Sequence, residues 1–298
     1  MKSRILLYGL IGLLVLVATA TGVFYRTPGV PIEYLTVRGE RAVFQGNGLY
    51  RYDPAALARE GIIWDAVNLF AGLPLFGLAI FLAGRGSLRG RLLLGGLLGY
   101  FFYVYLMYAV MIAFNRLFLV YVAIFSLSIV AFFLNLGEID VPRLPRHVSP
   151  GFPRRFFIGF SFVFAAALIL LWLGRIVPIM ATGRFPAELA GMATLETQAL
   201  DLGMVVPLAL SSGFLLWRRS AWGYLLAALS LTFGMMMCLT IPAWIAVPLL
   251  QEGKINPLEA VPFLFLCLGG LVLAGMFYRN LEEPVDGRDE RDERSDQS

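Results

Sequence analysis

The sequence predicts an all-α integral membrane protein with eight transmembrane helices. Apolar residues make up 59% of its 298 positions, well above the proportion typical of a soluble domain. Eight apolar runs each reach the roughly 20 residues that a helix needs to cross the hydrocarbon core. Backbone polar groups within lipid must be satisfied inside their own segment, so each run is expected to be a helix.

The eight predicted helices alternate with short polar segments. They cover residues 5–25, 62–83, 92–113, 117–136, 156–176, 198–217, 222–245 and 260–278. The first run also fits a signal peptide, because Ala18-Thr19-Ala20 follows a basic start and resembles a cleavage site. The apolar run continues to Phe24, which favours a retained helix.

The distribution of arginine places both termini in the cytoplasm. Basic residues cluster at every second helix boundary, as the positive-inside rule requires. These clusters lie at positions 2–4, 85–91, 143–155, 218–219 and 279. They are topology signals and do not form the continuous basic face of a nucleic-acid-binding protein.

The chain divides into two halves of four helices each. The first half covers residues 1–136 and includes an outer segment, 26–61, with a predicted hairpin at 32–43 and a short surface helix at 54–60. A cytoplasmic linker, 137–155, leads to the second half, 156–278. The charged tail, 279–298, has almost no apolar residues and is expected to be disordered in the cytoplasm.

The two halves share an internal repeat. Residues 66–93 align with residues 199–226 without a gap. The aligned leucines carry little weight in membrane helices, whereas Pro, Arg, Ser and Gly also coincide. The coinciding pairs are Pro74 with Pro207, Arg85 with Arg218, Ser87 with Ser220 and Gly90 with Gly223. Four helices separate the copies, so the repeat is parallel, with a pseudo-two-fold axis along the membrane normal.

Polar side chains near the outer ends of the second and sixth helices form the candidate ligand site. Asp65 and Asn68 share one helix face, and Gln198 and Asp201 share the matching face of the other copy. With Glu196 nearby, they predict a site for a small molecule or a cation. The alternative is that these groups cap helices or bond between helices.

Four tyrosines follow the outer half of the third helix. They are Tyr100, Tyr103, Tyr105 and Tyr108, and the last two are candidate ligand-binding residues. The repeat places them opposite a Met/Cys-rich wall at 235–238, which suggests an apolar pocket with hydroxyl groups. Ordinary packing is the alternative.

Several kinds of site lack the residues that they need. The chain has one histidine, His147, in a loop, and two cysteines, both within apolar runs, so we expect no metal and no cofactor. No catalytic motif occurs at a spacing where its chemistry would operate, and no catalytic residue is assigned.

Five segments resemble a group of uncharacterised multi-pass bacterial membrane proteins. They are 48–53 (GLYRYD), 85–91 (RGSLRGR), 117–123 (LFLVYVA), 198–203 (QALDLG) and 222–225 (WGYL). This resemblance implies a bacterial plasma membrane location and carries over no activity.

We expect a transporter or binding protein for a small molecule or ion, with a cavity between the two halves. One alternative is a membrane-embedded enzyme that acts on a lipid-linked substrate, with Asp65, Asp201 or Glu196 as general acid or base. Another is a non-catalytic sensor or assembly partner that is recognised through its outer segment.

Overall fold

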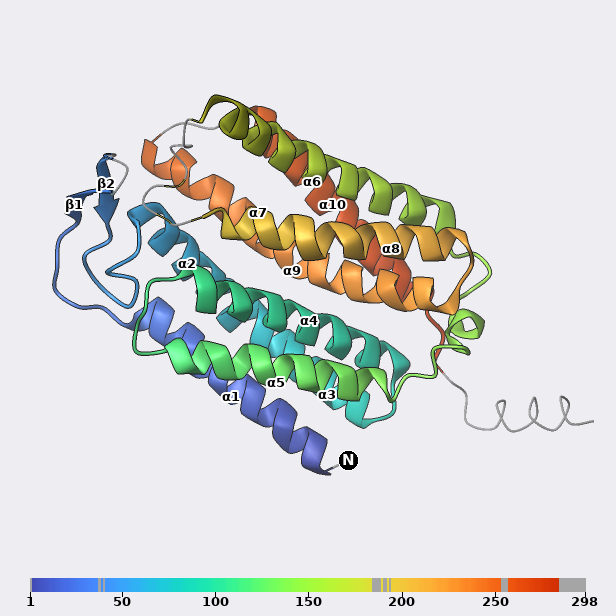
Figure 1. The fold of residues 1–298 in the computed structure, drawn as a ribbon. Helices are drawn as coiled ribbons and strands as arrows, with labels where there is room; N and C mark the ends of the chain where they lie inside the picture. Colours follow the sequence, from blue (N-terminus) through green and yellow to red (C-terminus); the bar gives the residue numbers. More distant parts are fainter. Residues whose placement is uncertain are drawn as a thin grey trace, which may run out of the picture.

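The computed structural model is a bundle of long helices that run along a common axis (Figure 1). It describes residues 2–36, 39, 41–183, 189, 192, 194–252 and 257–283. Within these ranges, seven helices are long and apolar enough to cross a membrane, and they coincide with the first seven predicted spans. The eighth predicted span falls in the last helix, whose described apolar part is shorter, Leu264–Arg279.

The first half is built from four rods that alternate in direction (Figure 1). The second rod is continuous from Ala55 to Gly84 and includes one π-helical turn. The elements are α1 (Lys2–Phe24), α2 (Ala55–Val67), η1 (Asn68–Gly72), α3 (Leu73–Gly84), α4 (Leu88–Met111) and α5 (Phe118–Leu136). α4 is the most buried of them, because it packs against α3, α5 and the second half.

The predicted hairpin is present between α1 and α2. β1 (Ile32–Leu35) pairs antiparallel with β2 (Arg41–Phe44), and the rings of Tyr34 and Phe44 stack at 3.8 Å. The helix predicted for 54–60 is present as the start of α2, but its predicted end is wrong, because α2 continues through Gly61. A Cβ at Gly61 would lie 3.2 Å from the Tyr50 ring, so this glycine allows the ring to approach and does not end a helix.

The second half begins after the linker. Its elements are α6 (Arg154–Thr182), α7 (Glu196–Leu200), η4 (Asp201–Val205), α8 (Val206–Trp217), α9 (Ala221–Glu252) and α10 (Pro257–Arg279). α7, η4 and α8 form one rod, which packs against α6 and α9. The linker that precedes α6 contains the short helix η2 (Leu144–His147).

The linker is fixed to the end of α10. Ser149 N donates to Asn280 O at 2.8 Å, and Leu281 is fully buried. The carboxylate of Glu283 accepts hydrogen bonds from Ser87 Oγ and Leu88 N, both at 2.7 Å. The first residues of the predicted disordered tail are therefore ordered up to Glu283, and 284–298 lie outside the described residues.

The two halves meet along α4 and α9, which lie side by side at the centre of the bundle (Figure 1). A Cβ at Gly96 of α4 would overlap the side chain of Thr232 on α9, so the missing side chain allows the two helices to pack closely. α2 also contacts α9, and α7 contacts α4. The end of the bundle that carries the hairpin is called here the hairpin end. At this end, α2 and α4 of the first half contact α7 and α9 of the second half.

Each of the two interrupted rods contains a π-helical turn just before a proline. η1 begins at Asn68 and is followed by Pro74, and η4 begins at Asp201 and is followed by Pro207. A proline cannot donate to the carbonyl four residues earlier and its ring crowds that carbonyl, so a wider turn relieves the clash. π-turns of this kind are frequent at functional sites.

Candidate functional site

A cavity of about 320 Å³ lies between the two halves at the hairpin end, and we call it the central cavity. α2 and α4 form its wall on the first half. α6, the start of the α7–η4 rod and α9 form its wall on the second half. Its lining includes Trp64, Trp172 and several methionines, together with a small set of polar side chains. Apolar walls with a few polar groups are typical of small-molecule sites.

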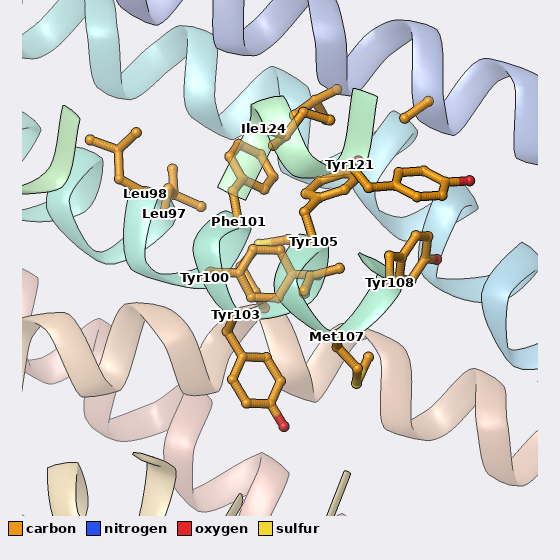
Figure 2. Close-up of a cluster of buried hydrophobic side chains, with 14 of the residues drawn as sticks. Leu97, Leu98, Tyr100, Phe101, Tyr103, Tyr105, Met107, Tyr108, Tyr121 and Ile124 are labelled. Atoms are coloured by element: carbon orange, nitrogen blue, oxygen red, sulfur yellow. The ribbon is translucent and has the colours of Figure 1, made fainter. Parts of the chain in front are cut away.

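Asp201 is held in the wall of this cavity by side chains from both halves. Tyr103 Oη on α4 donates to Asp201 Oδ1 at 2.6 Å, and Trp172 Nε1 on α6 donates to Asp201 Oδ2 at 3.0 Å. Figure 2 shows the Tyr103 ring projecting from α4 away from Tyr105 and Tyr121. Both carboxylate oxygens are therefore oriented, and one of the two hydrogen bonds crosses between the halves.

A second cavity, of about 150 Å³, lies inside the second half between α6, α8, α9 and α10. We call it the apolar cavity, because apolar side chains, chiefly phenylalanine and leucine, form most of its wall. Asp201 and Met237 line both cavities. The Asp201 carboxylate thus stands at the boundary between the central cavity, which both halves line, and the apolar cavity within the second half.

Acidic side chains outnumber basic ones around the central cavity. Among the described lining residues, Glu60, Glu196 and Asp201 carry carboxyl groups and Arg175 carries the single guanidinium. The guanidinium of Arg175 lies 5.5 Å from the centre of the Trp172 ring. By formal charge the chamber favours a cation, and its aromatic walls can also stabilise a cation through their π faces.

Four of the seven predicted site residues line the central cavity, and three do not. Glu196, Gln198, Asp201 and Tyr108 are in its wall. Asp65, Asn68 and Tyr105 are packed inside the first half and have at most 1% of their surface exposed. The structure therefore does not bring the two aspartates into one chamber.

Asp65 is bound within the first half by two tyrosines. Tyr50 Oη donates a short hydrogen bond to Asp65 Oδ2, and Tyr108 Oη lies 3.4 Å from Asp65 Oδ1 while donating to Gly61 O at 2.9 Å. Burial, followed by the nearby Asp65 carboxyl, raises the pKa of Tyr50 well above its usual value, so its hydroxyl remains a donor. These contacts fasten the loop before α2 to the helix itself.

Tyr105 and Asn68 are core residues. The Tyr105 ring packs against the rings of Tyr108 and Tyr121, with centroids 5.6 and 6.2 Å apart (Figure 2). Asn68 Oδ1 lies against Gly72 within the π-helical turn, where an added Cβ would be 3.1 Å away. Both side chains therefore pack within the first half, outside the central cavity.

Sequence reasoning did not assign Tyr103, Trp172 and Arg175 to the site. Tyr103 belongs to the predicted row of tyrosines, but the spacing does not distinguish it from Tyr105, which faces the other way. Trp172 is a donor-bearing aromatic residue in the middle of an apolar run, and Arg175 is a charge at the end of that run. These two polar groups on α6 could have indicated a site on this helix, because a polar group near lipid needs a partner.

Within the described ranges, no cluster of three His, Cys, Asp or Glu side chains is placed to hold a metal ion. No protein-family model, curated protein or solved structure matches the chain. The function is therefore inferred from the chemistry of the two cavities.

Proposed function

We propose that the protein is a multi-pass membrane transporter or transport-like binding protein that accepts a small organic cation in the central cavity. The observation that carries this proposal is the position of Asp201. Its carboxylate is oriented by Tyr103 from the first half and Trp172 from the second, at the boundary of two cavities.

An organic cation with an apolar body suits this chamber best. Its charge would be attracted to Asp201 and Glu196, and its body would lie between Trp64, Trp172 and the methionines. A volume of about 320 Å³ is at the lower end of the range for small-molecule pockets. A bare metal ion would leave most of the apolar wall without a partner.

The succession of the two cavities supports transport rather than binding alone. The apolar cavity extends from Asp201 to Phe157, which lies near the start of α6 at the end of the bundle opposite the hairpin. The two chambers together run along most of the second half. A rocking motion that breaks the contact between Tyr103 and Asp201 would open the boundary between them, as alternating access requires.

The backbone supports a parallel repeat as the frame for such a motion. The π-turns at Asn68 and Asp201 occupy equivalent positions of the aligned copies. The turns that follow α3 and α8 are also equivalent. Gly86 and Arg219 both have positive φ, and Ser87 N donates to Leu82 O as Ser220 N donates to Leu215 O.

We further propose that eight helices span a bacterial plasma membrane with both termini in the cytoplasm. The arginine clusters at alternate helix boundaries support this orientation. A cysteine introduced at Asn47 should react with an impermeant maleimide added to intact cells. Cysteines at Ser87 and Ser220 should react only after the membrane is permeabilised, and the opposite pattern would overturn the orientation.

Uptake of phenyltrimethylammonium into proteoliposomes tests the function directly. This probe carries a permanent charge and an aromatic ring, so it does not cross a bilayer unaided and fits the proposed chemistry. Saturable uptake by the wild-type protein, lost in Asp201→Asn, is the expected result. Absence of both binding and uptake would contradict the proposal, and binding without uptake would restrict the function to that of a binding protein.

A further inference from the structure

A third cavity, of about 520 Å³, lies at the end of the bundle opposite the hairpin. The linker before α6, the first residues of α6, the turn between α8 and α9, and the start of α9 form its wall. We call it the basic cavity, because Arg154, Arg155 and Arg219 line it and no aspartate or glutamate is among its described lining residues.

The three arginines differ from three others at the same end of the bundle, which form ion pairs within the protein. Arg4, Arg89 and Arg143 form ion pairs with Glu138, Glu283 and Asp140. In the part of the chain that the structure describes, no carboxylate forms an ion pair with Arg154, Arg155 or Arg219. The Nε atom of Arg154 is buried and has no hydrogen-bond acceptor there. A topology signal needs positive charge only, and does not explain why three guanidinium groups share one cavity.

The other groups around this cavity suit a phosphate. Tyr224 and Ser149 add hydroxyl groups to its wall. α6 begins at Arg154, so the positive end of its helix dipole lies beside the arginines. Guanidinium groups bind phosphate oxygens in a bidentate geometry and stay charged at any physiological pH.

We propose that the basic cavity binds a phosphate group, and that an anionic phospholipid headgroup supplies it. Phe156, with 72% of its surface exposed, lies next to the arginines in the cavity wall. An acyl chain can cover this ring while the headgroup phosphate reaches Arg154 and Arg219. A free phosphate ester offers the same chemistry without the chain.

Binding of soluble short-chain lipids to the purified full-length protein tests this proposal. Dihexanoyl phosphatidylglycerol should bind, and zwitterionic dihexanoyl phosphatidylcholine should bind about tenfold or more weakly, since its headgroup has no net charge. Arg154→Gln and Arg219→Gln should each weaken phosphatidylglycerol binding by about tenfold, as the loss of a charge-assisted contact implies.

Arg218→Gln is the matched control, because Arg218 is in the same turn but lies over the Phe214 ring, 5.8 Å from its centre, and is not in the cavity wall. It should leave phosphatidylglycerol binding unchanged. Inorganic phosphate that displaces the lipid at similar concentration would indicate a free phosphate ester as the source, whereas its failure to compete would indicate the lipid. Equal affinity for the two lipids, or an equal loss in Arg218→Gln, would overturn the proposal.

Discussion

Tyr103 and Asp201 connect the two halves of the bundle through a 2.6 Å hydrogen bond. Tyr103 lies on α4, in the first half, and Asp201 begins η4, in the second. This contact is a link between the halves and, at the same time, part of the wall of the central cavity. Loss of this hydrogen bond should therefore lower the free energy of unfolding of the whole protein.

Tyr103→Phe should lower the free energy of unfolding by about 1 kcal/mol, because one hydrogen bond to a carboxylate is lost within the helical bundle. Tyr105→Phe is the control. Tyr105 is on the same helix and fully buried, and its hydroxyl has no hydrogen-bond partner among the described residues. Denaturant unfolding in detergent compares the two variants. Equal losses would show that the contact with Asp201 adds nothing.

Asp65 should be a structural residue. Asp65→Ala should destabilise the protein by about 2–4 kcal/mol, since it leaves the buried hydroxyl of Tyr50 without its acceptor and creates a void. Asp65→Asn keeps an acceptor oxygen and should have a much smaller effect. Thermal unfolding of both variants provides the measurement. If Asp65→Asn strongly weakens ligand binding and leaves stability unchanged, Asp65 is a binding residue and not a structural one.

Asp53, which precedes α2, should make stability depend on pH. Burial raises the pKa of its carboxyl from 3.8 to about 6, despite a hydrogen bond from Ala113 N at 2.6 Å that lowers it. The folded state then holds a proton that the unfolded state has released. The stabilising effect is complete below about pH 4 and is lost as the pH rises through about 6, with a maximum of about 3 kcal/mol.

Asp53→Asn should abolish this part of the pH dependence, because the amide stays neutral throughout. Unfolding curves at about pH 4 and about pH 7 compare the variant with the wild type. An equal change in stability between the two pH values in wild type and in Asp53→Asn would rule out Asp53 as a source of the pH dependence.

The equivalent glycines Gly90 and Gly223 should be equally intolerant of a side chain. A Cβ at Gly90 would lie 2.5 Å from Ala83 N, and one at Gly223 would overlap the backbone of Leu216, at the end of the preceding helix in each half. Each alanine substitution should destabilise by about 2 kcal/mol or more, because backbone atoms must move. Gly77→Ala, with open space at its Cβ, should be neutral. A neutral effect at only one of the two glycines would argue against equivalent turns.

Local sequence signals were enough for the helices and for the hairpin. Apolar runs of sufficient length define the first seven spans, and alternation around Arg38-Gly39 predicts the hairpin at 32–43, which the antiparallel pairing of β1 with β2 confirms. Asp201 could be singled out for the same reason, since an acid inside an apolar run needs a partner. These features depend on the residue itself and on its near neighbours.

The different positions of Asp65 and Asp201 could not be predicted from spacing. In the aligned sequences Asp65 corresponds to Gln198, and Asp201 corresponds to Asn68. The two acids therefore occupy positions of the alignment that differ by about one helical turn. Asp65 is satisfied by Tyr50, which arrives from a loop, whereas Asp201 is reached by Tyr103 and Trp172 from two other helices. Periodicity gives the face of a helix, but the neighbours on that face depend on the tertiary packing.

Calorimetric titration of phenyltrimethylammonium into the purified protein tests the central claim, that Asp201 anchors a cation between the halves. The matched control is Asp65→Asn, which changes an acid that lies in the first half and outside the cavity. Wild type and Asp65→Asn should bind with equal affinity, and Asp201→Asn should bind about tenfold or more weakly, because it loses the charge that attracts the ligand. The neutral isostere tert-butylbenzene should not compete. Equal affinity in wild type and Asp201→Asn, or no binding to the wild type, would contradict the account.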